Sequence, residues 1–353
     1  MSADVAQVAT NTHVQTLEVL EVIAETADAV SVILAVPDSL VRKFRYLPGQ
    51  FLTVRVPDGA DGSVARCYSL SSSPHLDDNL VVTVKRVPGG YASNWICDNL
   101  RAGDRLTVLS PSGKFVPRSL HQDMLLVGAG SGATPLLSIA KSVLIGGTAT
   151  IYFFYANRSH DDVIFGSEIE EILMEFPDRF TVFHSLDDRE GVPTVDGLAH
   201  AFRPFRTFDV YLCGPDQFME TARDAMQQVK ISPEKIHTEI FQSLTGDPFA
   251  DIVIPPFEDG TDAAEVIVEL GGETHTLVWP REVALLDVLL SKGFDAPYSC
   301  REGACSACAC TLRSGEVRMR KNDTLVDADL AAGLTLACQA VPVSDRVEIG
   351  FDQ

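Results

Sequence analysis

The sequence predicts a multidomain protein: an antiparallel β-barrel, then a doubly wound α/β domain, then a small α+β domain. Up to about residue 110, short apolar runs alternate with turn residues, whereas after residue 123 strand-like and helix-like runs follow one another. Near the C-terminus, a glycine turn between two alternating runs precedes an apolar helix and a group of cysteines. With 353 residues, 46% of them hydrophobic, the chain is long enough to form two or three buried cores.

The first domain, residues 14–118, is expected to be the barrel. Its apolar runs predict strands at 16–23, 30–36, 51–56, 66–70, 80–84 and 105–109. Six short strands at this spacing favour an antiparallel barrel. Residues 1–13 lack the charged and apolar regions of a signal peptide, so we expect a disordered N-terminus and no export signal.

The second domain, residues 119–241, is expected to hold a parallel sheet, because strands and helices alternate along it. Strands are predicted at 124–127, 150–155, 180–183, 210–213 and 239–241, and helices at 135–144, 167–176 and 216–229. Residues 242–262 carry turn and acidic residues without periodicity and are interpreted as a linker. In the third domain, residues 263–353, two runs separated by Gly271 and Gly272 predict a hairpin, and a helix is expected at 284–290.

The chain is acidic, with a net charge of -21. Residues 251–353 contain 18 Asp and Glu against 8 Lys and Arg, which is about half of the excess. This charge excludes nucleic acid as a partner and favours either a basic surface on another protein or a purely solubilising role. No apolar run approaches the ~20 residues that span a bilayer, so we expect no membrane contact and a cytoplasmic location.

Four cysteines have the spacing of an iron-sulfur site. Cys300, Cys305 and Cys308 follow C-x4-C-x2-C, and Cys338 lies further along the chain. This pattern is typical of plant-type [2Fe-2S] domains, whereas structural zinc, the main alternative, usually takes paired C-x2-C knuckles. Disulfides are less favoured, because Cys67, Cys97 and Cys213 are scattered in apolar runs. Cys310 begins a strand-like run, where packing is its expected role.

Two further stretches are suited to binding phosphates. Arg66 and Tyr68 share one face of a predicted strand, where an Arg suits a flavin phosphate and a Tyr offers a flat face to a ring. Gly89 and Gly90 precede a predicted helix at 92–100, whose first N-H groups, with Ser93, suit a phosphate. A capped helix without a ligand is the structural alternative.

A glycine-rich turn joins a strand to a helix in the second domain. It contains Gly128, Gly130, Gly132, Thr134 and Pro135, and such a turn lets a pyrophosphate reach the backbone and the helix N-terminus. Its pattern, G-x-G-x-G-x-T-P, departs from the Rossmann G-x-G-x-x-G. A second strand-turn-helix unit carries Cys213-Gly214-Pro215, and an ordinary buried thiol is the alternative interpretation of its cysteine.

In this order, the Arg-x-Tyr-Ser, G-x-G-x-G-x-T-P, Cys-Gly-Pro and cysteine motifs resemble the ferredoxin-NADP reductase superfamily with a C-terminal plant-type ferredoxin domain. The resemblance implies a β-grasp fold for residues 263–353 and catalytic roles for Ser69, Cys213 and Glu239 around the flavin and nicotinamide. It implies flavin contacts from Arg66, Tyr68, Ser69, Lys85, Gly90, Ser93 and Phe241. It further implies nicotinamide contacts from Gly128, Gly130, Gly132, Thr134, Pro135 and Gly214, and cluster ligation by Cys300, Cys305, Cys308 and Cys338.

The stretches 63–70, 90–95 and 295–305 are similar to the reductase components of 3-ketosteroid 9α-hydroxylases. That similarity implies electron flow from NADH through FAD and a [2Fe-2S] cluster to a separate terminal oxygenase, here the Rieske-type hydroxylase of steroid catabolism. A flavin is needed between the two because NADH delivers two electrons and the cluster accepts one. The alternatives are a reductase for phenylacetyl-CoA epoxidase or another di-iron oxygenase, and an iron-sulfur redox sensor, which would not need a nicotinamide loop.

The choice between NADH and NADPH depends on the loop after the second predicted strand of the α/β domain. Arg158 and Ser159 suit a 2'-phosphate, but Asp161 and Asp162 follow at once and would repel it. One of these carboxylates suits a ribose hydroxyl. The sequence therefore predicts a preference for NADH.

Overall fold

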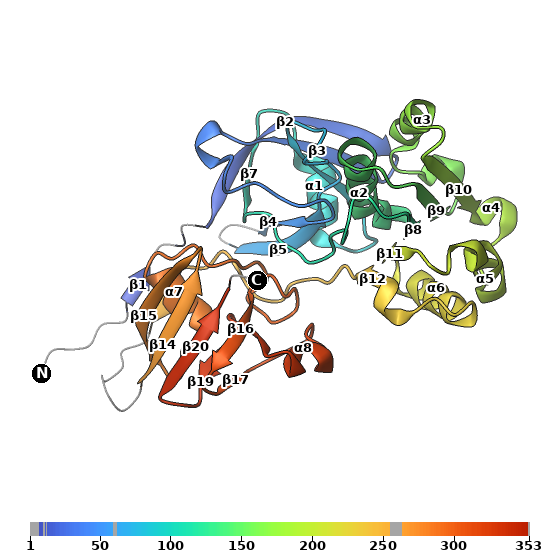
Figure 1. The fold of residues 1–353 in the computed structure, drawn as a ribbon. Helices are drawn as coiled ribbons and strands as arrows, with labels where there is room; N and C mark the ends of the chain where they lie inside the picture. The colour runs from blue at the N-terminus through green and yellow to red at the C-terminus, as the bar shows by residue number, and fades with distance from the viewer. Residues whose placement is uncertain (1–6, 10, 12, 59–61, 255–262, 352–353) are drawn as a thin grey trace, which may run out of the picture.

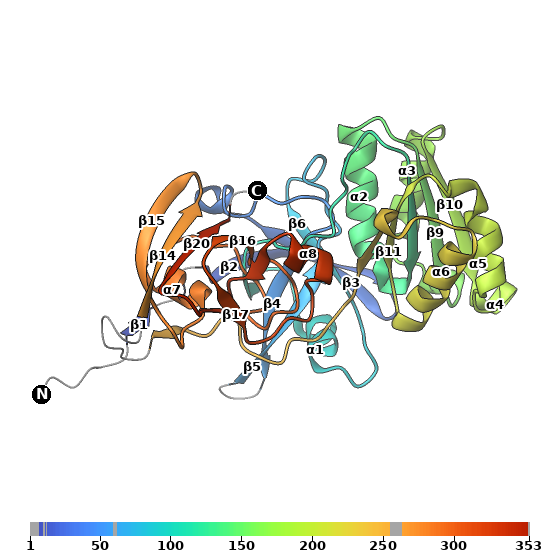
Figure 2. The same cartoon turned by 60° about the horizontal axis from the view of Figure 1, so that its bottom comes forward.

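A computed structural model describes residues 7–9, 11, 13–58, 62–254 and 263–351. In two views of it, the α/β domain and the C-terminal domain lie at opposite ends of the molecule, with the barrel strands between them (Figures 1 and 2). This arrangement matches the three domains expected from the sequence. Within the described residues, no helix combines the length and the apolar character that crossing a membrane requires.

The N-terminal domain is a six-stranded antiparallel barrel. Its strands are β2 (Gln15–Thr26), β3 (Ala29–Ala35), β4 (Phe51–Asp58), β5 (Gly62–Ser69), β6 (Leu80–Lys85) and β7 (Arg105–Val108), in the order β5-β4-β7-β2-β3-β6. A bridge between Leu70 and Val82 joins the two ends of the sheet. Helix α1 (Tyr91–Asn99) buries Ala92 and Ile96 in the barrel core, since side chains four apart share one helix face. All six predicted strands are confirmed.

The middle domain is a parallel sheet covered on both faces. Its strands are β8 (Met124–Ala129), β9 (Ile151–Asn157), β10 (Phe180–Leu186), β11 (Asp209–Cys213) and β12 (Ile236–Glu239), in the order β10-β9-β8-β11-β12. Helices α2 (Ala133–Gly146) and α3 (Gly166–Glu175) cover one face, and α5 (Val195–Phe202) and α6 (Asp216–Gln228) cover the other. The strand order reverses between β8 and β11, where ligands bind in open α/β sheets.

One local expectation in this domain needs correction, and two helices were not predicted. The last strand ends at Glu239 instead of covering 239–241, because it pairs with β11 only over Ile236–Glu239. Helices α4 (Asp187–Glu190) and α5 were not expected. Both are short, and only tertiary packing of Leu198 and Phe202 against the sheet identifies α5 as a covering helix.

The C-terminal domain has the β-grasp form. Strands β14 (Ala263–Leu270), β15 (Glu273–Pro280), β16 (Ala309–Ser314), β18 (Leu334–Leu336) and β20 (Arg346–Gly350) form one sheet in the order β15-β14-β20-β16-β18. Helix α7 (Leu285–Ser291) buries five apolar side chains in the core of this domain. The remaining elements are the pair β17 (Val317–Met319) and β19 (Ala340–Pro342) and helix α8 (Asp327–Ala331). The hairpin turn is confirmed: Gly271 and Gly272 both have positive φ, as a two-residue type I' turn requires.

The sequence predicted a disordered N-terminus over residues 1–13, but part of this segment is ordered. Strand β1 (Gln7–Ala9) pairs with β13 (Ile252–Ile254), which lies in the segment expected to be a linker. Buried Asn11 donates to Pro248 O and accepts from the Tyr298 hydroxyl at 2.8 Å. These contacts tie both chain segments to the C-terminal domain, and neither shows a periodic signal because each strand is only three residues long. The rest of the expected linker, residues 255–262, lies outside the described residues.

Candidate functional site

The four spaced cysteines converge at one end of the C-terminal domain. Cys300, Cys305 and Cys308 lie in the loop between α7 and β16, and Cys338 lies between β18 and β19. The Cys338 thiol is within hydrogen-bond reach of Cys300 and Cys308, and Cys300 is likewise within reach of Cys305. All eight cysteines of the chain are free, so the disulfide alternative is wrong. Among the residues described, no set of three His, Cys, Asp or Glu forms a preorganised site for a single metal ion.

Backbone N-H groups are directed at these sulfurs. Cys300 Sγ accepts from Glu302 N at 3.3 Å and Ala304 N at 3.4 Å, and Cys308 Sγ accepts from Cys338 N at 3.4 Å. Hydrogen bonds from Cys305 and Cys338, with smaller contributions from the Glu302 and Ala304 N-H groups, lower the pKa of Cys300 well below its ordinary value. Four convergent thiols with N-H donors around them fit a [2Fe-2S] cluster, whose sulfur ligands are thiolates stabilised by such donors.

Glycine is required once in this loop. Gly303 has φ +77, and a Cβ there would lie 2.8 Å from Lys321 O. The obstacle to a side chain there is a backbone carbonyl of a neighbouring loop. Arg301 and Ser306 also have positive φ, so the loop is strained at two non-glycine residues and is held by its surroundings.

A cavity of about 210 Å³ opens where the barrel meets the α/β domain. Eight residues expected to bind cofactor line it: Arg66, Tyr68, Ser69, Lys85, Gly90, Ser93, Thr134 and Phe241. Two cations and the N-terminus of α1, which are sources of positive potential, lie in its walls. Together with the half-buried ring of Tyr68, they fit a flavin with its phosphates.

Sequence reasoning did not assign the other eight lining residues to the cofactor, among them Ser131, Gln242 and Ser243. The last two had been placed in the linker, because a turn-rich stretch gives no sign of what it covers. Arg66 donates to Leu244 O at 3.3 Å and so holds this stretch against the barrel. Ser93 Oγ accepts from Val87 N at 3.1 Å, which shapes the turn before α1.

The glycine-rich turn and the Cys-Gly-Pro turn lie against each other at the point where the sheet order reverses. Cys213 pairs in register with Gly128 on one side and Glu239 on the other. A Cβ on Gly132 would lie 2.1 Å from Cys213 O, and one on Gly214 would lie 3.2 Å from Ala129 Cβ. Helix α2 starts at Ala133, with Pro135 in its first turn, as the sequence predicted. The two turns fit the close backbone approach that a dinucleotide needs.

Cys213 itself is fully buried and lines neither of the cavities described in this section. Burial raises the pKa of its thiol well above the ordinary value. The side chain therefore stays a neutral thiol and does not act as a nucleophile.

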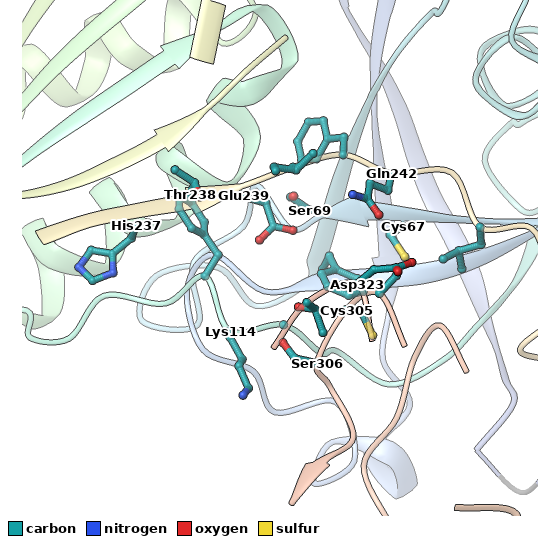
Figure 3. Close-up of a pocket in the computed structure, with 18 of the residues that line it drawn as sticks. Cys67, Ser69, Lys114, His237, Thr238, Glu239, Gln242, Cys305, Ser306 and Asp323 are labelled. Carbon is teal, nitrogen blue, oxygen red and sulfur yellow. The ribbon is translucent and has the colours of Figure 1, made fainter. Parts of the chain in front are cut away.

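A larger cavity, of about 490 Å³, connects the barrel, β12 and the cluster loop. Ser69, Glu239, Cys305 and Ser306 face the same space, with the Glu239 carboxylate turned toward Ser69 (Figure 3). Burial raises the pKa of Glu239 to about 7. The carboxyl group can therefore gain or lose a proton near neutral pH.

Arg158, in the loop after β9, forms two ion pairs. Arg158 Nη2 donates to Asp28 Oδ2 of the barrel at 2.9 Å and also pairs with Asp162. Ser159 Oγ donates to Asp162 Oδ2 at 2.7 Å. Asn157, at the carboxyl end of β9, is buried close to the Tyr155 hydroxyl, and neither of its amide atoms has a partner in good hydrogen-bond geometry. It is a candidate ligand contact that sequence reasoning missed.

Fold and site together define an oxidoreductase that places a flavin between a dinucleotide and an iron-sulfur cluster. Three family models match in sequence order: an oxidoreductase FAD-binding domain over residues 16–116, an oxidoreductase NAD-binding domain over 126–224 and a 2Fe-2S iron-sulfur cluster binding domain over 268–343. The cofactors are therefore FAD, NAD and a [2Fe-2S] cluster.

The chain belongs to the family of oxygenase reductase components. It is 52% identical to the ferredoxin reductase component of 3-ketosteroid-9-alpha-monooxygenase from Mycolicibacterium smegmatis, over 97% of this chain and 98% of that one. It is 31% identical to one of the subunits of 1,2-phenylacetyl-CoA epoxidase from Escherichia coli, over 97% and 98%. The structure of phthalate dioxygenase reductase has the same fold, with a TM-score of 0.57 and 24% identity over 97% of this chain and all of that one.

We expect Gly132→Ala to weaken NADH binding by about tenfold, because overpacking costs typically 1–3 kcal/mol and the new Cβ must push the two turns apart. Gly166→Ala is the matched control, since its Cβ would meet only Val163 Cγ1, at 3.9 Å. Titration of NADH into each flavin-loaded protein measures the effect. Equal affinities in the two variants would contradict the close approach of the turns.

The raised pKa of Glu239 predicts a pH-dependent stability. Its pKa rises from 4.5 in the unfolded chain to about 7 in the fold, so the folded protein binds more protons in that window and loses stability as the pH rises through it. Glu239→Gln cannot ionise, so relative to the native chain it should gain roughly 1–2 kcal/mol across the window, after allowance for partial exposure, with no further gain above it.

Thermal unfolding of both proteins from about pH 5 to about pH 8 tests this difference. Glu234→Gln, which removes an exposed carboxylate just before β12 begins, is the control. Parallel stability curves for the native and Glu239→Gln proteins would show that the carboxyl titrates at its ordinary value.

Proposed function

We propose that the protein transfers electrons from NADH through FAD and its [2Fe-2S] cluster to a separate terminal oxygenase. The observation that carries this proposal is the larger cavity, because Ser69 and Glu239 of the flavin and nicotinamide side share it with Cys305 and Ser306 of the cluster loop. A sensor would need no such connection to a nicotinamide site. The bound flavin supplies the chemistry that accepts a hydride and returns its electrons singly.

In this proposal each group of residues has one task. The turns at 128–135 and 213–215 bind the dinucleotide through their backbone, and Arg66, Tyr68, Lys85, Gly90, Ser93 and Phe241 bind the flavin. Cys300, Cys305, Cys308 and Cys338 hold the cluster as thiolates. Domain boundaries at 14–118, 119–241 and 263–353 assign one cofactor to each domain.

Three residues are assigned to the chemistry itself. Cys213 fills the space behind the nicotinamide as a neutral thiol, which its full burial supports. Glu239 holds or releases a proton near neutral pH, and the adjacent Ser69 hydroxyl passes it on, which the raised pKa of Glu239 and the shared cavity support.

The terminal oxygenase that we propose is a Rieske-type 3-ketosteroid 9α-hydroxylase. The support is the 52% identity to a reductase component of that activity, against 31% to the epoxidase relative, the second candidate. The excess of carboxylates in residues 251–353 suits a basic docking surface on the oxygenase. We place this system in the cytoplasm, in line with eight free cysteines.

Reconstitution tests this function. The flavin- and cluster-loaded protein should support steroid hydroxylation by such an oxygenase when supplied with NADH, and should not support epoxidation of phenylacetyl-CoA. Cys308→Ser should lose the cluster and all product formation while it keeps flavin and NADH-driven reduction of a small dye, since a hydroxyl is a poor substitute for a soft thiolate. Product with the epoxidase alone would overturn the choice of partner, and a full iron-sulfur spectrum in the variant would overturn the ligand set.

The ion pairs of Arg158 support a preference for NADH over NADPH. Asp28 and Asp162 already neutralise this guanidinium and would repel a 2'-phosphate. We expect NADH to be preferred by at least tenfold in kcat/KM, about 1.4 kcal/mol. Asp162→Asn should reduce the preference for NADH over NADPH, and the neighbouring Asp161→Asn should leave it unchanged. Equal use of both nucleotides by the native protein would return Arg158 to a phosphate-binding role.

A further inference from the structure

Three hydrogen-bonded side chains, Thr53, Cys67 and Ser299, cross from the barrel into the cluster domain and are called the bridge below. Thr53 on β4 and Cys67 on β5 face each other across the sheet, with Thr53 Oγ1 3.6 Å from Cys67 Sγ. Thr53 Oγ1 also lies 2.6 Å from Ser299 Oγ of the cluster domain. Thr53 and Ser299 are each 1% exposed, so water does not compete for these bonds.

Each end of the bridge is attached to a cofactor site. Cys67 is bonded through the backbone to Tyr68, whose ring lines the flavin cavity. Ser299 is bonded through the backbone to Cys300, a candidate cluster ligand. A continuous run of covalent and hydrogen bonds therefore leads from the flavin wall to the cluster loop.

Apolar packing and a second hydrogen bond surround the contact between Thr53 and Ser299. Ala65 and Leu109 of the barrel belong to the same buried apolar cluster as the core of the C-terminal domain, which packs around the bridge. Ser112 Oγ donates to Tyr298 O at 3.3 Å beside it. Interfaces between domains of one chain are commonly mobile, but these neighbouring contacts hold the two domains together around the Thr53–Ser299 bond.

We propose that Thr53, with Cys67 and Ser299, is the positioning contact through which electrons pass from the flavin to the cluster. This inference rests on the proposed electron path. In each step the reduced flavin loses one electron and the oxidised cluster gains one, so the contact is used twice for each NADH. No atom moves through it: the three side chains keep their protons, and the proton that the flavin releases leaves on the side of Glu239.

Thr53→Val removes the hydroxyl and keeps the shape of the side chain, and Thr53→Ser keeps the hydroxyl. In anaerobic stopped-flow experiments with NADH, flavin reduction should be unchanged in Thr53→Val. The following reduction of the cluster should be about tenfold slower, a change of ~1.4 kcal/mol in barrier, because electrons must then cross a gap in place of a hydrogen bond. Thr53→Ser should stay within about twofold of the native rate. Thr107→Val, on the neighbouring strand β7, is the control and should match the native protein.

Two readouts separate a positioning role from a merely structural one. Hydrogen exchange around residues 297–300 and the electron paramagnetic resonance spectrum of the reduced cluster should be unchanged in Thr53→Val. If exchange there rises in proportion to the loss of rate, the contact is only a clamp and the proposal fails. Cys67→Ala, which shortens the other end of the bridge, should slow the same step and serves if Thr53→Val does not fold.

The experiment also separates this inference from the proposed function. A native protein whose flavin is reduced by NADH while its cluster stays oxidised would refute the electron path and the bridge together. A native protein that reduces its cluster, with Thr53→Val at the same rate, would refute the bridge alone.

Discussion

The alternation of side chains along β5 governs how the barrel joins the cluster domain. Successive residues of a strand face opposite sides of the sheet. Val64 and Tyr68 therefore pack on the barrel core, whereas Ala65 packs in the core of the C-terminal domain and Cys67 in its outer layer. One strand thus supplies Tyr68 to the flavin cavity from one face and Ala65 to the contact with the cluster domain from the other.

The interface that follows from this alternation is built from weak contacts that support one another. The buried Thr53 hydroxyl lies against Ser299, and the carboxylate of Glu302 accepts from Thr245 N at 2.8 Å, which holds the segment after β12 against the cluster loop. Strand β13 lies further along that segment and pairs with β1. A single exposed contact of this kind stabilises little, but several that fix the same geometry leave the domain few ways to move.

Burial also sets the protonation of the groups near the cofactor sites. It raises the pKa of Cys67 to about 12 and that of Glu239 to about 7. Near neutral pH the thiol therefore stays neutral and inert, while the carboxyl can gain or lose a proton. The same physical effect therefore makes one side chain a packing group and the other a candidate acid or base, and the difference lies in their intrinsic pKa values.

The three domains, all six barrel strands, the glycine hairpin and the grouping of the four cysteines follow from the sequence alone, because hydrophobic period, turn residues and ligand spacing are local signals. Which surfaces meet is a property of the folded chain. Thr53 and Ser299 are 246 positions apart, β1 and β13 are three residues long, and Gln242 lines a cavity although its stretch has the composition of a linker. Alternation along a strand shows that a face is buried, but the partner that buries it depends on how distant segments fold together.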